Sequence, residues 1–100
     1  MRNTTHSANG TSFHDHTVSA TLEQLIQVCG QPHAWGSADE KSQYDWYMET
    51  EDGKVFTIYD WKEYREIDED EVIQWHIGAH DSYTAACGQR ELEKALSQLP

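Results

Sequence analysis

Apolar and polar positions alternate along the middle of the chain. Within residues 43–50, Trp46 and Met48 are separated by more polar neighbours, which predicts a strand with one buried side. Residues 54–61 are rich in β-branched and aromatic side chains and predict the returning strand. The short acidic segment between them ends in Gly53, which suits the positive φ of a tight turn. We therefore expect a β-hairpin here.

A helix is predicted over residues 21–29, where apolar side chains recur at helical spacing. Thr21 can cap the first turn, and Gln24 completes the capping-box pattern. Gly30 followed by Pro32 is typical of a helix end.

The remaining segments predict simpler elements. Residues 11–18 predict a short edge strand, residues 72–78 a further strand, and residues 82–98 a second helix with an apolar face. Gly88 lies near the middle of that helix, where glycine costs about 1 kcal/mol relative to alanine. Residues 1–10 are polar and lack periodicity, so we expect a flexible tail.

These elements follow the order (β)-α-β-β-β-α and predict one α+β domain over residues 11–100. The expected architecture is a three- to four-stranded antiparallel sheet packed against two helices on one face. The same order occurs in double-stranded-RNA-binding domains. A chain with seven Lys and Arg residues and a net charge of −11 argues against RNA binding.

The charge also disfavours binding to anionic membranes. No apolar run approaches the ~20 residues of a membrane-spanning helix. Residues 1–10 show no apolar core of a signal peptide, so we expect the protein to stay in the cytosol.

Acidic residues are concentrated in one part of the sequence. Thirteen of the eighteen carboxylates fall between Asp39 and Glu71, against four Lys or Arg residues. The densest stretch comprises Glu63, Glu66, Asp68, Glu69, Asp70 and Glu71. It is either a solubilising loop or a surface that presents charge as a nucleic-acid backbone does, to a basic groove on another protein.

A second candidate site is aromatic. It combines the ends of two predicted strands: Tyr59, Asp60, Trp61, Lys62, Trp75 and His76. Aromatic walls with a few polar groups are typical of a pocket for a small ligand or peptide. The alternative is that Trp61 and Trp75 complete a thin hydrophobic core.

Metal binding and catalysis receive little support. Four histidines form two pairs near predicted strands: His14, His16, His76 and His80. No compact zinc-binding pattern accompanies them, and Cys29 and Cys87 belong to no CxxC motif, so we expect buried reduced thiols. Neither a GxSxG motif nor a Gly-rich phosphate loop is present. We therefore expect no cofactor, no metal and no enzymatic activity.

Several short motifs stand out along the chain. They are Gly10-Thr11-Ser12, Leu25 ahead of Gly30-Gln31-Pro32, Asp52-Gly53-Lys54-Val55, Thr57-Ile58-Tyr59-Asp60-Trp61-Lys62 and Trp75-His76-Ile77-Gly78. Together they resemble the motifs of a group of small acidic accessory proteins from tailed phages and prophages. The resemblance covers residues 10 to about 80, and Cys29 stands where members have Phe. It implies a setting in which such proteins often inhibit bacterial defence, including CRISPR systems.

The leading functional hypothesis is a phage-encoded, non-enzymatic inhibitor that occupies a basic nucleic-acid-binding surface of a host defence protein. The first alternative is a small-molecule binder that sequesters a nucleotide-like immune signal in the aromatic pocket. The second alternative is an accessory protein of the virion or its assembly. We also expect self-association, as a dimer, because an open sheet edge needs cover.

Overall fold

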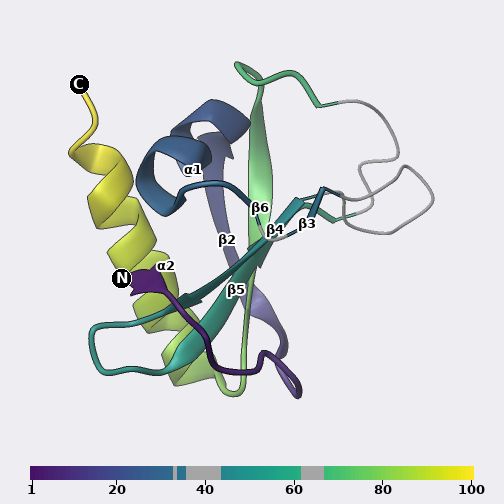
Figure 1. Ribbon diagram of the computed structural model, residues 1–100, viewed down its shortest axis with the longest axis vertical. Coiled ribbons are helices and arrows are strands. Elements are labelled where there is room, and N and C mark those ends of the chain that lie inside the picture. Colours follow the sequence, from purple (N-terminus) through teal and green to yellow (C-terminus); the bar gives the residue numbers. More distant parts are fainter. Residues whose placement is uncertain (33, 36–43, 62–66) are drawn as a thin grey trace.

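The structure is a computed structural model that describes residues 1–32, 34–35, 44–61 and 67–100 (Figure 1). Its elements are β1 (Arg2–Asn3), β2 (Ser12–Thr21), α1 (Leu22–Cys29), β3 (Ala34–Trp35), β4 (Tyr44–Glu49), β5 (Val55–Tyr59), β6 (Val72–Ala79) and α2 (Ser82–Ser97). The strands form one antiparallel sheet in the order β1-β4-β5-β6-β2, with β3 also paired to β4. The predicted α+β class is confirmed.

The sheet has more strands than the three or four predicted. β1 and β3 are two residues each, too short to show any alternation in the sequence. The expectation of a flexible tail over residues 1–10 needs correction at its start. Arg2 pairs with Glu49 and Asn3 with Met48, so this segment extends the sheet beyond β4.

The predicted capping box of α1 is present, and α2 also begins after a capping residue. The Thr21 hydroxyl accepts a hydrogen bond from the Gln24 N–H, and the Gln24 side chain accepts one from the Thr21 N–H. Gly30 ends α1 with a φ of 84°. Asp81 caps α2 by accepting a hydrogen bond of 2.7 Å from the Thr84 N–H.

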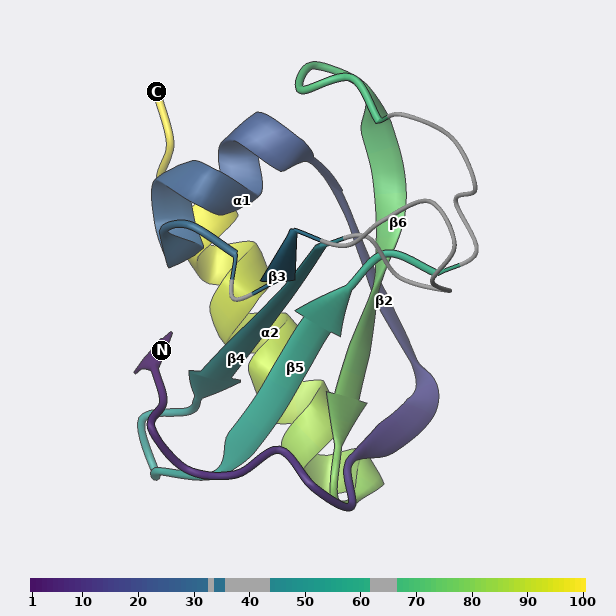
Figure 2. The ribbon, with the colours of Figure 1, turned by 45° about the vertical axis from the view of Figure 1, so that its right-hand side comes forward.

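The hydrophobic core lies between the helices and one face of the sheet. Figure 2 shows α2 crossing behind β4, β5 and β6, and α1 packs against α2 and β2 on the same side. Trp46 and Trp75 are fully buried there and meet edge to face at 5.5 Å. Each indole N–H donates to a backbone carbonyl, Trp46 to Gly30 and Trp75 to Ala20.

Gly88 has a packing role that the helix pattern did not indicate. A Cβ at this position would lie 2.7 Å from ring atoms of Phe56, so glycine allows α2 to approach β5 closely. The predicted weak point of the helix is therefore a point of close contact.

Neither helix in the described part of the chain has the length and apolar character needed to cross a membrane. Cys29 and Cys87 are buried free thiols, as predicted, and burial raises the pKa of Cys29 to about 12.

Candidate functional site

The face of the sheet opposite the helices carries a group of polar and aromatic side chains in two cross-strand rows. One row joins Asp45, Tyr59 and His76, and the other joins Tyr47, Thr57 and Gly78. Successive side chains on a strand point to opposite faces, so the open-face residues alternate with core residues such as Trp46 and Ile58. The hairpin and the β5–β6 pairing thus bring three aromatic or imidazole groups, Tyr47, Tyr59 and His76, onto one surface.

Aromatic rings cluster around His76 on this open face. Phe13 stacks on the imidazole with ring centroids 4.3 Å apart, and Trp61 lies nearly parallel to it at 6.1 Å. Tyr59 meets Trp61 edge to face at 6.2 Å. Phe13 and Trp61 remain 40% exposed, so the cluster keeps aromatic surface accessible.

A groove of about 320 Å³ lies beside the cluster. Its lining side chains come from β4 and β5, from Trp61, and from the loop that crosses the open face: Asp45, Tyr47, Thr57, Tyr59, Trp61, Ala8, Asn9 and Thr11. Gly78 leaves space for the Thr57 side chain of this lining, because a Cβ there would lie 2.5 Å from the Thr57 hydroxyl oxygen. The volume lies at the lower end of the ~300–1,000 Å³ typical of ligand pockets.

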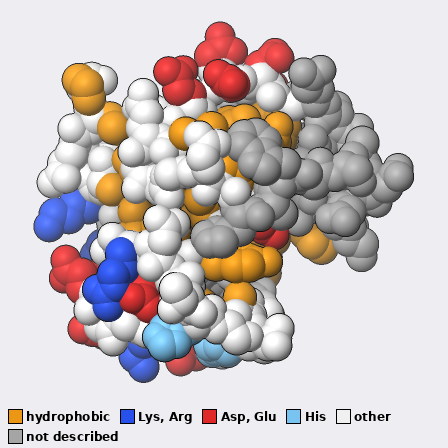
Figure 3. All heavy atoms as spheres, in the orientation of Figure 1, with side chains coloured by type: hydrophobic (Ala, Val, Ile, Leu, Met, Phe, Trp, Pro, Cys, Tyr) orange, Lys and Arg blue, Asp and Glu red, His pale blue; other side chains and the backbone are white. Residues whose placement is uncertain are grey.

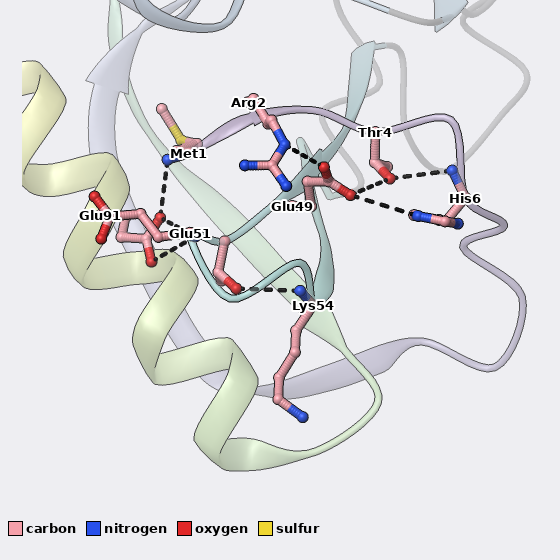
Figure 4. Close-up of polar contacts among 9 residues, drawn as sticks. Met1, Arg2, Thr4, His6, Glu49, Glu51, Lys54 and Glu91 are labelled. Carbon is pink, nitrogen blue, oxygen red and sulfur yellow. Dashed lines mark hydrogen bonds and ion pairs between the residues drawn. The ribbon is translucent and has the colours of Figure 1, made fainter.

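The N-terminal segment that leads into the groove loop is anchored by polar contacts (Figure 4). The Met1 amine lies 3.0 Å from Glu91 on α2, and Arg2 pairs with Glu49 on β4. The Thr4 hydroxyl donates to Glu49 at 2.9 Å. The hydrogen bond from Thr4, together with the Arg2 contact, lowers the pKa of Glu49. These contacts fix the start of the segment that forms the groove rim.

The electrostatics of the groove are set by Asp45. Its negative charge, followed by burial, raises the pKa of Tyr47, and burial raises the pKa of Tyr59. Burial lowers the pKa of His76, which favours the neutral imidazole near neutral pH. Among the described residues of the lining there is one carboxylate and no Lys or Arg.

The predicted aromatic pocket is only partly assembled by the structure. Tyr59, Trp61 and His76 lie together on the open face. Trp75 does not join them, because it precedes His76 on β6 and points into the core. Asp60 is also buried, and its carboxylate accepts a hydrogen bond of 2.8 Å from a backbone N–H of β4.

The described part of the acidic stretch forms a turn ahead of β6. Asp68, Glu69 and Asp70 are exposed, and Glu71 is partly buried. Acidic side chains gather at the top of Figure 3, over this turn, and others lie among the blue Lys and Arg side chains at the lower left. The remaining predicted site residues lie outside the described residues: Lys62, Glu63 and Glu66.

The histidine pairs do not converge. A bulge interrupts β2 between Phe13 and Thr17, where Asp15 adopts a φ of 65°. His14 donates to the Ala79 carbonyl, while His16 donates to the side-chain oxygen of Gln89 on α2. Among the described residues, no three His, Cys, Asp or Glu side chains are grouped to hold a metal ion.

Sequence reasoning missed Phe13, Asp45, Tyr47 and Thr57. The register of the hairpin places Asp45 opposite Tyr59 and Tyr47 opposite Thr57, and the Gly53 turn was the signal for it. The place of Phe13 depends on an edge strand with a bulge, which the sequence does not reveal.

Taken together, exposed aromatic rings and a carboxylate favour cationic or neutral ligands over phosphate-bearing ones. Comparison with known proteins adds no further constraint on that ligand. No protein-family model matches the chain, and neither a curated protein nor a solved structure matches it.

Proposed function

We propose that the chain is a phage-encoded, non-enzymatic inhibitor of a bacterial defence protein such as a CRISPR effector. In this proposal it acts in the host cytosol by occupying a basic nucleic-acid-binding surface. The observation that carries the proposal is the exposed turn of Asp68, Glu69 and Asp70 on a chain with a net charge of −11.

The physical basis is competition for the partner's Lys and Arg residues. Adjacent exposed carboxylates create a local negative potential, which steers a basic partner toward that end of the molecule. The carbonyl of Glu69 accepts a hydrogen bond of 3.1 Å from the Glu23 N–H in the first turn of α1. The turn therefore sits beside the positive end of a helix, which offsets part of its like-charge repulsion.

The experiment that tests this function is a capture assay at increasing salt concentration. Tagged protein is incubated with lysate of a bacterial host, and bound proteins are identified and assayed for nucleic-acid binding. We expect a nucleic-acid-binding protein that loses this activity when bound, and an interaction that weakens steeply with salt.

A matched pair of double variants separates the effect of the acidic turn on binding from the effect of the net charge. Asp68→Asn with Asp70→Asn removes two charges from the turn, and Asp52→Asn with Glu93→Gln removes two exposed charges elsewhere. The first pair should slow association much more than the second. Equal effects, or capture unaffected by salt, would contradict the proposal.

The groove supports a second candidate, a binder of small aromatic molecules. Its tyrosine and tryptophan walls suit stacking, and stacking resists salt. A nucleotide-like signal is a poorer fit than a neutral or cationic molecule, because the described lining offers a phosphate no Lys or Arg.

A further inference from the structure

We propose that the open-face groove receives an arginine side chain of the basic partner, with the guanidinium against Tyr47, Tyr59 and Trp61 and toward Asp45. This inference rests on the proposed function and names the chemistry by which the partner would be held. The acidic turn would then steer the partner, and the groove would fix its position.

The aromatic walls are the first argument for a guanidinium. A planar guanidinium stacks on aromatic faces and is attracted by the negative charge of the ring face. Trp61 is the best ring type for this contact, and 40% of its surface is exposed beside the groove. Tyr47 and Tyr59 supply phenol rings from adjacent strands.

The charge of the lining is the second argument. Asp45 lies in the groove, and its charge is strong enough there to raise the pKa of the neighbouring Tyr47. A carboxylate beside an aromatic wall suits arginine, whose N–H groups donate to carboxylate oxygens while its plane stacks. Burial lowers the pKa of His76 and so favours its neutral imidazole. The side chain therefore adds little positive charge that would repel a bound cation.

The shape of the site is consistent with a side chain rather than a whole peptide segment. The groove has a volume of about 320 Å³ and is bounded on one side by residues 8–11. Thr11 closes this loop through two hydrogen bonds to the Ala8 carbonyl, at 3.2 Å from its N–H and 2.8 Å from its hydroxyl. A long side chain can enter from the exposed rim while its backbone stays outside.

The test measures the affinity of the full chain for fluorescent oligoarginine, with oligolysine and oligocitrulline of the same length as comparisons. We expect oligoarginine to bind most tightly, and the uncharged citrulline peptide to bind least. Trp61→Ala should weaken oligoarginine about three- to tenfold, the range of a cation–π contact. Asp45→Asn should weaken it about tenfold, as removal of a charge-assisted hydrogen bond does.

Each variant has a control that makes the same chemical change elsewhere. Tyr83→Ala removes an aromatic ring that is 67% exposed on α2, and Asp52→Asn removes one exposed carboxylate from the turn between β4 and β5. Both should change the affinity less than about threefold. Thermal melts show whether each variant is folded. If Trp61→Ala melts at a lower temperature than the wild type, the test rests on Asp45→Asn, which keeps the shape of the side chain.

Three results would overturn the inference, and they separate it from the proposed function. Unchanged affinity in both groove variants, with loss in the Asp68→Asn, Asp70→Asn double variant, rejects the groove and leaves the proposed function standing. No binding of any cationic peptide rejects both. Binding of ATP that Trp61→Ala abolishes assigns the groove to a small molecule instead.

Discussion

Trp75 and His76 are neighbours on β6, yet they belong to opposite faces of the sheet. Trp75 is fully buried beneath the helices and donates its indole N–H to the Ala20 carbonyl. His76 lies on the face opposite the helices, between Phe13, Tyr59 and Trp61. The two faces place similar aromatic residues in different surroundings, because both helices pack on one face and no described helix covers the other (Figure 2).

The two faces also differ in how their aromatic side chains are held. On the covered face, Trp46 and Trp75 pack against each other and satisfy their N–H groups internally. On the open face, Trp61 rests on His76 with much of its ring exposed. We infer that the covered face supplies stability, and the open face supplies binding.

The largest expected effect comes from deleting one tryptophan from each face. Trp75→Ala should destabilise the protein by about 3–5 kcal/mol, because it leaves a large cavity in a small core. Trp61→Ala should cost less than about 1 kcal/mol, because its ring is partly exposed. Urea unfolding measures both. Similar losses of unfolding free energy in the two variants would contradict the inferred difference between the faces.

A glycine on each face gives the next comparison. Gly88→Ala should destabilise by about 1–3 kcal/mol, since its Cβ would press on the Phe56 ring, although helix propensity alone favours alanine. Gly78→Ala should cost less, because its close neighbour is the Thr57 hydroxyl at the edge of the open groove. Thermal melts rank the two, and a stabilised Gly88→Ala variant would contradict the close packing of α2.

Glu49 connects the N-terminal segment to the sheet, and we expect its substitution to have a smaller effect on stability. Its pKa lies below its ordinary value of 4.5, so the carboxylate contributes stability above that pH and loses it as the pH falls. Glu49→Gln should flatten this acid limb of the stability curve and loosen the groove rim. Hydrogen exchange at residues 1–11 measures the loosening, with Glu93→Gln as control. Unchanged exchange would show that Arg2 and Thr4 hold the segment without the charge.

The smallest effect concerns His76. Burial places its pKa below the ordinary 6.5, so the unfolded chain takes up this proton more readily than the folded one. Stability from this group is therefore complete above pH 6.5 and falls as the pH drops below that value. His76→Gln should lose less stability than the wild type over that pH range in denaturant titrations. An identical pH dependence would mean that the imidazole is not shielded by its aromatic neighbours.

Much of the fold follows from local patterns in the sequence. α1 begins at the capping box of Thr21 and Gln24 and ends at Gly30, as predicted. The alternation at Trp46 and Met48 correctly indicated the buried side of β4. The same alternation places Trp75 and His76 on opposite faces, although the predicted aromatic pocket combined them. β1, β3 and the β2 bulge could not be predicted, because pairing partners distant in sequence determine them.

An NMR titration tests whether the open face is the binding surface while the covered face stabilises the fold. Oligoarginine is titrated into the wild-type chain, and shifts of assigned resonances are mapped on the structure. We expect the largest shifts to cluster at Asp45, Tyr47, Tyr59, Trp61 and His76, with core resonances such as Trp46 little changed. Shifts confined to Asp68, Glu69 and Asp70, with the groove unaffected, would contradict it.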